Sequence, residues 1–217
     1  IRLHETKAPE ARTAAVRYFE AARTFLKPHQ PRLVGIGGLS GTGKSTLAAR
    51  IAASIGTPPG AIHLRSDIQR KRMFGRQELD RLPQDAYREE VSDKLYAALN
   101  QQATVALAAG ASVIVDAMHG DARRRGELEA VSAAAGVPFT GLWLEAPADL
   151  RIERVSARVR DASDATPEVA RRQIGTQPQG SAWTVIDASR PLDQISQTAL
   201  AACRTGRQRE QDGTAFR

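Results

Sequence analysis

Apolar residues along the chain fall into short runs separated by longer stretches of helical periodicity. The short runs predict strands at 33–36, 61–64, 112–115, 139–144 and 183–186. Between them, apolar positions recur every three or four residues, which predicts helices at 43–53, 83–109, 122–135, 146–160 and 191–203. Strands that alternate with helices are typical of βαβ units. We therefore expect an α/β fold with a parallel sheet covered by helices on both faces.

The first 31 residues have a different pattern. Apolar positions such as Val16 and Phe19 predict an amphipathic helix over 8–27, and the segment Lys27 to Pro31 breaks it as a linker. This helix either packs on the main domain or belongs to a preceding one. Because the chain begins at Ile1 rather than Met, we expect a fragment or a processed product. The expected organisation is a helix and linker at 1–31, one domain at 32–204, and a polar, disordered tail at 205–217.

Composition narrows the class of protein. Of the 217 residues, 41% are apolar and 25% charged, which excludes disordered, collagen-like and coiled-coil chains. Lysine and arginine total 31 against 24 acidic residues, giving a net charge of +7. Since 26 of the 31 are arginines, two interpretations stay open: an anionic partner, or an arginine-rich solvated surface.

Cysteine content and hydropathy indicate where in the cell the protein is expected to be. The single cysteine, Cys203, cannot form an intramolecular disulfide, which favours a reducing environment. The longest weakly polar stretch, 103–115, has about 13 residues, whereas a membrane-spanning helix needs about 20. From the sequence we expect a cytoplasmic protein with no membrane association.

The segment Gly38 to Ser45 reads GLSGTGKS and fulfils the spacing G-x-x-x-x-G-K-S, between an apolar strand and a helical stretch. Glycines allow positive φ, and they let consecutive backbone N–H groups approach phosphate oxygens at a helix N-terminus. Lys44 would bind the β- and γ-phosphates of ATP, and the Ser45 hydroxyl would bind Mg²⁺. The predicted nucleotide-binding residues are Gly38, Ser40, Gly41, Thr42, Gly43, Lys44, Ser45 and Thr46.

Asp116 ends the strand at 112–115 and is the second candidate magnesium ligand; its alternative role is to cap the next helix. The following residue is Ala117, where a glutamate that polarises water is common in motor-type ATPases. This favours transfer to a substrate over hydrolysis. The only asparagine, Asn100, is followed by Gln101, so the guanine-reading motif Asn-Lys-x-Asp is missing and ATP is the expected nucleotide.

Candidate acceptor-binding and catalytic residues follow the second and fourth strands. Asp67, after the second strand, is placed to orient an acceptor hydroxyl, either together with or instead of capping a helix. With an ordinary pKa of about 3.9 it would be ionised. Arg151, Arg154 and Arg158 share a helix face that either covers the phosphates or is simply solvated. We interpret the triplet at 123–125 as surface charge.

Five motifs occur in order at 37–46, 66–71, 113–116, 142–147 and 161–165. Together they resemble the bacterial predicted-kinase family of P-loop proteins, an AAA-type ATP-binding group similar to polynucleotide kinase, zeta toxin, chloramphenicol phosphotransferase and gluconate kinase. The resemblance covers about residues 32–190.

The resemblance implies a three-layer P-loop fold like that of adenylate kinase, with a five-stranded parallel sheet and a helical lid. It implies that the lid carries Arg154 and Arg158 as catalytic residues and that the loop starting at Asp187 lies near adenine. It also implies that Asp67, Arg70 and Asp116 face the acceptor. Such domains often follow a domain similar to aminoglycoside phosphotransferases, which is a possible upstream partner.

Three functions remain open from the sequence. The first is an ATP- and Mg²⁺-dependent kinase acting on a hydroxyl of a small molecule such as a sugar, aminoglycoside or nucleoside. The second is a polynucleotide 5′-hydroxyl kinase, which the scarcity of aromatic residues disfavours because single strands bind by base stacking. The third is an ATP-binding regulatory module of an upstream domain.

Overall fold

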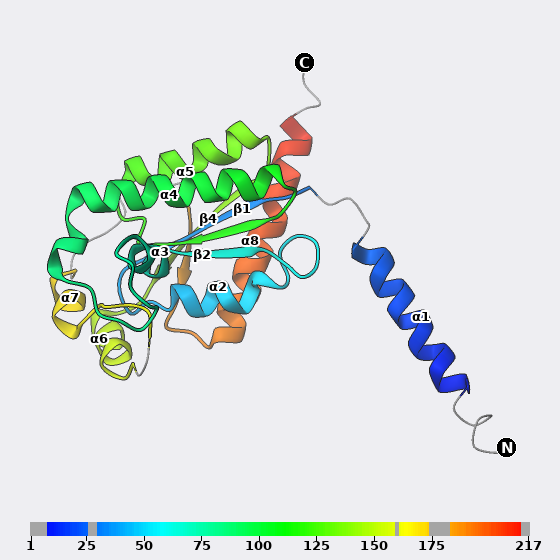
Figure 1. Ribbon diagram of the computed structural model, residues 1–217, viewed down its shortest axis with the longest axis horizontal. Helices are drawn as coiled ribbons and strands as arrows, with labels where there is room; N and C mark the ends of the chain where they lie inside the picture. Colours follow the sequence, from blue (N-terminus) through cyan, green and yellow to red (C-terminus); the bar gives the residue numbers. More distant parts are fainter. Residues whose placement is uncertain (1–7, 26–29, 159–160, 174–182, 214–217) are drawn as a thin grey trace.

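The computed structural model describes residues 8–25, 30–158, 161–173 and 183–213. Its five strands form one parallel sheet in the order β2-β3-β1-β4-β5 (Figure 1). The strands are β1 (Leu33–Gly38), β2 (Ile62–Arg65), β3 (Val113–Asp116), β4 (Phe139–Glu145) and β5 (Thr184–Asp187). The predicted α/β fold and five-stranded parallel sheet are confirmed, with β1 paired to β3 on one side and to β4 on the other.

Helices cover both faces of the sheet. They are α1 (Ala8–Phe25), α2 (Lys44–Ala52), α3 (Ser66–Met73), α4 (Glu89–Ala108), α5 (Ala122–Ala135), α6 (Ala148–Ser156), α7 (Pro167–Arg172) and α8 (Leu192–Gly213), with a 3₁₀ turn at Gln84–Tyr87. Helices α2 and α8 pack on one face and α4 and α5 on the other, while α6 and α7 lie together at one end of the sheet (Figure 1).

Alternation along the strands divides the core into two layers. In β1, Val34 and Ile36 point to the face covered by α2 and α8, whereas Leu33 points to the face covered by α4 and α5. These three side chains are fully buried. The central strand therefore has an apolar contact on each side, as expected for a parallel sheet between helices.

Glycines on the α4–α5 face of the sheet make room for one large ring. A Cβ added at Gly35, Gly37 or Gly141 would lie within 3.1 Å of the Trp183 ring. Trp183 is 4% exposed, and its indole N–H donates to Glu129 Oε1 of α5 at 2.7 Å. The bare backbone of β1 and β4 thus forms the surface on which Trp183 packs.

Helix boundaries differ from the sequence prediction in three places. Within the expected helix at 83–109, the 3₁₀ turn is separated from α4 by Arg88, which has an extended ψ of 155°. The expected helix at 146–160 ends at Ser156 as α6, and residues 159–160 are outside the described part. Helix α8 continues to Gly213, although we expected disorder from residue 205, because Arg, Gln and Glu are good helix formers.

Helix α1 extends away from the sheet (Figure 1). Its side chains at 9–23 are all exposed, including Val16, Tyr18 and Phe19. The apolar stripe is therefore not buried against the domain. Among the described helices, none is both long enough and apolar enough to cross a membrane.

We predict that Gly141→Ala destabilises the protein by about 2 kcal/mol, because the new methyl group would lie 2.3 Å from Trp183 Cγ. Gly126→Ala is the matched control: Gly126 is inside α5 with open space around its Cβ position, so this change should stabilise by up to about 1 kcal/mol. Urea unfolding measures both. Equal stability of Gly141→Ala and the wild type would contradict the packing described here.

Candidate functional site

The loop between β1 and α2 has the backbone conformation that its glycines were expected to provide. Gly41 and Gly43 have φ of 86° and 91°, and α2 begins directly after them at Lys44. A Cβ at Gly41 would lie 2.4 Å from the carbonyl oxygen of Arg151 in α6. The loop is therefore pressed closely against α6, and its amides lie at the N-terminal end of a helix, where anions are stabilised.

Lys44 has its ammonium group inside this loop. Its Nζ donates to the Leu39 carbonyl at 3.0 Å. Burial lowers the pKa of Lys44, and the negative charges of Asp116 and Asp67 partly oppose this effect. An anion at this position would compensate for the buried positive charge.

Ser45 and Asp116 meet because β1 and β3 are paired in register. Ile36 lies opposite Asp116, and the Ser45 hydroxyl donates to Asp116 Oδ2 at 2.5 Å. His63 Nε2 lies 3.2 Å from the same oxygen. Burial alone would raise the pKa of Asp116, but the contacts of His63, Lys44 and Ser45 outweigh it and lower the pKa.

The structure excludes one of the two roles left open for Asp116. The N-cap of α5 is Asp121, whose side chain accepts from the Arg123 amide at 2.8 Å, so Asp116 does not cap that helix. An ionised carboxylate beside a hydroxyl fits Mg²⁺, which takes hard oxygen donors and keeps several waters or phosphate oxygens. Within the described residues, no cluster of three or more His, Cys, Asp or Glu side chains could hold a metal. The Ser45 hydroxyl and the Asp116 carboxylate are oxygen donors of the kind that Mg²⁺ takes.

A cavity of about 710 Å³ opens beside the loop. One part is lined by the loop, α6, and the start of α8. The other part, which we call the α3–α4 half, is lined by Ser66, Asp67, Arg70, Tyr87, Glu89, Ser92, Leu95, Tyr96, Met118 and Arg124. A single cavity that joins both parts has room for two small ligands that meet at the loop.

Asp67 is in the first turn of α3 and faces this cavity. The N-cap of α3 is Arg65, and no side-chain capping bond is made there, so Asp67 does not cap the helix. Burial and the neighbouring Asp116 raise the pKa of Asp67, against the attraction of Lys44. The expectation of an ordinary pKa was wrong, because the sequence does not reveal that two carboxyl groups share one buried site.

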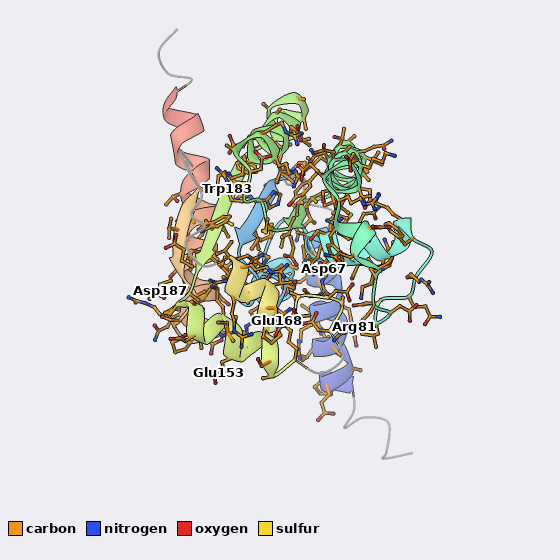
Figure 2. All side chains as sticks on the ribbon, turned by 90° about the vertical axis from the view of Figure 1, so that its left-hand side faces the viewer. Asp67, Arg81, Glu153, Glu168, Trp183 and Asp187 are labelled. Carbon is orange, nitrogen blue, oxygen red and sulfur yellow. The ribbon has the colours of Figure 1, made fainter. Side chains whose placement is uncertain are left out.

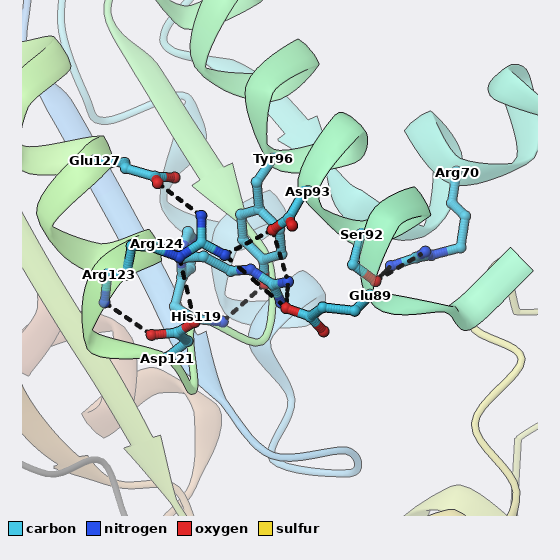
Figure 3. A network of polar contacts seen from close by, with 10 residues as sticks. All are labelled: Arg70, Glu89, Ser92, Asp93, Tyr96, His119, Asp121, Arg123, Arg124 and Glu127. Atoms are coloured by element: carbon cyan, nitrogen blue, oxygen red, sulfur yellow. Dashed lines mark hydrogen bonds and ion pairs between the residues drawn. The ribbon is translucent and has the colours of Figure 1, made fainter.

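Arg70 and Arg124 both line the α3–α4 half of the cavity. Figure 3 shows the polar contacts of both residues. Arg124 lies over the Tyr96 ring, 4.6 Å from its centroid, and is paired with Glu89 and Asp93 of α4. The assignment of the triplet 123–125 to surface charge holds for Arg123 and fails for the other two. Arg124 and Arg125 are buried, and Arg125 donates to the His119 carbonyl at 2.8 Å.

Helices α6 and α7 lie over the loop. Arg154 and Arg158 line the cavity as expected, although Arg158 lies just beyond the end of α6. Arg151 does not share their environment: it is 3% exposed, and its guanidinium reaches the Ser40 carbonyl at 3.4 Å. Arg160, which follows these three arginines in the sequence, is outside the described residues.

Gln173, at the end of α7, contacts the phosphate loop directly and was not singled out from the sequence. Its Oε1 accepts the backbone N–H of Ser40 at 2.9 Å, and its Nε2 lies 3.6 Å from Met118 Sδ. The Ser40 amide of the loop is therefore already hydrogen-bonded to a side chain at the end of α7.

Asp164 joins the segment between α6 and α7 to the other side of the cavity. It accepts from Lys71 Nζ at 3.2 Å, from the Leu82 amide at 3.1 Å and from the Tyr87 hydroxyl at 2.7 Å. Lys71 is almost fully buried, and its side chain also donates to the Glu78 carbonyl. Hydrogen bonds to the Asp164 carboxylate thus hold three chain segments together.

The remaining predicted residue, Asp187, lies away from the cavity lining. Figure 2 shows it near the left edge of the molecule, whereas Asp67 lies near the middle. Its carboxylate accepts from the Ser189 amide at 3.0 Å and from Arg190 Nε at 3.2 Å. The loop after β5 reaches the cavity through Arg190 instead.

Gly38 and Asp116 are buried beneath the cavity lining, whereas the other predicted loop residues, Ser40 to Thr46, form that lining.

The five-stranded parallel sheet and the phosphate loop at the end of its central strand define a P-loop fold. The AAA domain family model matches residues 33–208, and the chain belongs to that family. Uncharacterized proteins of Mycobacterium tuberculosis and Mycobacterium bovis are 30% identical over 189 residues, which is 85% of this chain. The chain spans 37% of the length of these relatives.

Solved structures agree with this fold. A sugar kinase from a Janibacter species is 22% identical, with a TM-score of 0.58, covering 80% of this chain and 95% of the other. A gluconokinase from Sinorhizobium meliloti is 22% identical, with a TM-score of 0.56, covering 87% and 98%. The Mycobacterium tuberculosis APS kinase in complex with AMPPNP and APS is 21% identical, with a TM-score of 0.58, covering 82% and 99%.

We predict that Asp164→Ala destabilises the protein by about 3 kcal/mol, because it leaves the Lys71 ammonium buried without its carboxylate partner. Asp193→Ala removes a partner of Arg50 in an exposed ion pair and should cost less than about 1 kcal/mol. Chemical denaturation of the two variants gives the comparison. Similar small losses in both would show that the Asp164 contacts do not hold the three segments together.

We predict that Asp67→Asn stabilises the protein at pH 7 by about 1 kcal/mol. Because the pKa of Asp67 is raised by folding, the native state holds its proton more tightly than the unfolded chain does. Its ionisation therefore costs stability as pH rises from the unfolded value of 3.8 through the raised native value. Unfolding measured from pH 4 to pH 8 should show the advantage of the variant growing with pH. An advantage that does not change with pH would refute this cause.

Proposed function

We propose that this protein is an ATP- and Mg²⁺-dependent kinase that transfers the γ-phosphoryl group to a hydroxyl of a small molecule. The observation that carries the proposal is the single cavity in which the phosphate loop, Lys44 and Asp67 face one another. Beyond the loop, the α3–α4 half of the cavity provides space for an acceptor, and we call it the acceptor half from here on. The sugar kinase, gluconokinase and APS kinase structures share this fold.

The loop residues bind the triphosphate. The loop amides nearest the start of α2 would donate to phosphate oxygens, and the helix dipole adds a positive potential there. Lys44 exchanges its contact with the Leu39 carbonyl for phosphate oxygens. The anion relieves the cost of keeping the Lys44 ammonium buried.

Ser45 and Asp116 hold the metal ion. When held by these two residues, Mg²⁺ would supply positive charge that offsets the negative charge of the phosphates. Asp116 suits this role because its lowered pKa keeps it ionised. His63 and the Ser45 hydroxyl fix the direction in which its oxygen points.

Asp67 orients the acceptor hydroxyl. The hydroxyl oxygen attacks the γ-phosphorus, the bond from that phosphorus to the β,γ-bridging oxygen breaks, and ADP leaves. The hydroxyl proton passes to a carboxylate oxygen of Asp67 and later to water. Because Asp67 has a raised pKa, it accepts a proton more readily than an ordinary aspartate.

Arg154 and Arg158 cover the phosphates from the side of α6. Both line the cavity; Arg158 Nε lies 3.6 Å from Asp161 Oδ2, whereas Arg154 has no carboxylate within 4.0 Å among the described residues. Their positive charges oppose the negative charge that spreads over the transferred group, which lowers the barrier to transfer.

We predict that acceptor-dependent ADP release separates the roles of two residues. Lys44→Ala should weaken MgATP binding and abolish turnover, since it removes the buried cation from the loop. Asp67→Asn should retain ATP binding and lower turnover 100-fold or more, roughly the contribution of a positioned general base. Calorimetry with MgATP and a coupled ADP assay over a panel of sugars, nucleosides, aminoglycosides and oligonucleotides measure both.

The control for this experiment is Asp193→Asn on the exposed start of α8, which should behave as wild type. ATP binding without turnover for any acceptor would indicate a regulatory nucleotide-binding module instead. Failure of MgATP to bind would refute the proposed function altogether.

A further inference from the structure

The motif at 161–165 lies between α6 and α7, at the end of the sheet where these two helices lie together (Figure 1). Four of its residues line the cavity: Asp161, Ser163, Asp164 and Ala165. Asp164 is tied to the acceptor half, because it accepts from the Tyr87 hydroxyl at 2.7 Å. Asp161 has different partners, since its carboxylate faces two arginines.

These two arginines come from distant parts of the chain. Asp161 Oδ2 is 3.6 Å from Nε of Arg158, which follows α6, and Oδ1 is 3.6 Å from Nη2 of Arg65, the last residue of β2. The same Oδ1 accepts the backbone N–H of Ser163 at 3.0 Å. This local hydrogen bond fixes the direction of the carboxylate, as in an Asx turn. Asp161 therefore joins the segment after α6 to the end of β2.

Arg65 is itself held firmly by the sheet and its surroundings. It lies opposite Asp116 in the pairing of β2 with β3, and its Nε is 4.0 Å from Asp116 Oδ2. Its Nη1 donates to Glu78 Oε1 at 3.3 Å. The guanidinium thus has carboxylates from three chain segments around it, and the side chain is 20% exposed. A series of alternating charges therefore runs from the carboxylate at the end of β3 to the arginine that follows α6.

Arg158 lies close to the phosphate loop and has donors to spare. It lines the cavity, and its positive charge adds to the effect of burial in lowering the pKa of Lys44. Asp161 is the one carboxylate within 4.0 Å of Arg158 among the described residues, and the buried Nη1 of Arg158 has no hydrogen-bond partner there. A long side chain loses rotamer entropy when it is fixed. The carboxylate favours one orientation through Nε and leaves other N–H groups for a phosphate oxygen.

Arg154 provides an internal comparison. It lines the same cavity from α6, yet it has no carboxylate within 4.0 Å in the described part of the chain. Asp161 therefore has a direct contact through which it can orient Arg158 and has none to Arg154.

We propose that Asp161 is a positioning residue for phosphoryl transfer: held by Arg65 and by its own turn, it orients Arg158 toward the γ-phosphoryl group. The inference rests on the proposed kinase function and gives the motif at 161–165 a part in it. A guanidinium that is already oriented stabilises the charge of the transferred group without having to be ordered during the reaction.

The test measures recognition of the γ-phosphoryl group and requires no acceptor. Calorimetry gives the Kd of MgADP and the Kd of MgAMPPNP, and we call the first divided by the second the γ-ratio. The wild type should have a γ-ratio well above one. Asp161→Asn should lower it about 5- to 10-fold, because Arg158 keeps its charge and loses its preferred orientation. Asparagine can still accept the Ser163 N–H, so this change removes the charge and keeps the turn.

Double variants connect the effect to Arg158. Arg158→Gln should lower the γ-ratio at least as much as Asp161→Asn, and the two changes together should lower it no further, since nothing is left to orient. Combined with Arg154→Gln, the effect of Asp161→Asn should be additive. Glu168→Gln is the matched control. It removes the carboxylate of an exposed pair with Arg171, also three residues apart, and should leave the γ-ratio unchanged.

Two further measurements separate positioning from a merely structural role. Asp161→Glu restores the charge and should recover part of the γ-ratio. With any acceptor that is turned over in the ADP assay, Asp161→Asn should lower kcat and leave the KM for that acceptor nearly unchanged. Thermal melting identifies a variant that fails to fold.

The inference would be overturned by an unchanged γ-ratio in Asp161→Asn, by additivity with Arg158→Gln, or by equal coupling to Arg154→Gln. A wild-type γ-ratio near one would also overturn it. A loss of stability in Asp161→Asn without a change in the γ-ratio would show that Asp161 only holds its segment in place. Failure of the kinase function itself is recognised separately, by the absence of MgATP binding to the wild type.

Discussion

The contact between Ser45 and Asp116 is the interaction on which the rest of the site depends. It exists because β1 and β3 are paired in parallel with Ile36 opposite Asp116, so that the start of α2 meets the end of the neighbouring strand. Each parallel strand ends at the same edge of the sheet, and ligands of open α/β folds bind at this edge. Without the β1–β3 pairing, the phosphate loop would still turn, but it would lack an ionised carboxylate beside its hydroxyl.

Charged groups of opposite sign lie buried next to one another around this contact. Lys44 lies between two carboxyl groups, and their attraction partly offsets the burial of its ammonium. The same proximity has the opposite effect on Asp67, whose pKa is raised by Asp116. Two carboxyl groups in one site thus acquire different protonation behaviour from their surroundings alone, which suits one to hold a cation and the other to accept a proton.

The sequence predicts a parallel sheet between helices and the phosphate loop, because these depend on local patterns of apolar residues and glycines. It does not predict which charged residues are buried. Arg124 and Arg125 read as part of an arginine triplet. Arg124 is buried over the Tyr96 ring and Arg125 is buried against the loop at 119–120, whereas Arg123 is exposed. Likewise, Asp187 ends its strand as Asp116 does, but its own turn occupies its carboxylate. The contacts of Arg124 with Glu89 and Asp93 join residues 35 and 31 positions apart, and the spacing of residues along the sequence does not predict them.

The bond from the Ser40 amide to Gln173 links the helices above the loop to whatever the loop binds. A single N–H cannot serve a side-chain oxygen and a phosphate oxygen at full strength. An anion that uses this donor must therefore compete with Gln173, and by thermodynamic reciprocity each weakens the hold of the other on the loop. A stronger hydrogen bond between Gln173 and the Ser40 amide would therefore weaken nucleotide binding. At this donor, the rigidity of the unliganded protein and its affinity for the nucleotide oppose each other.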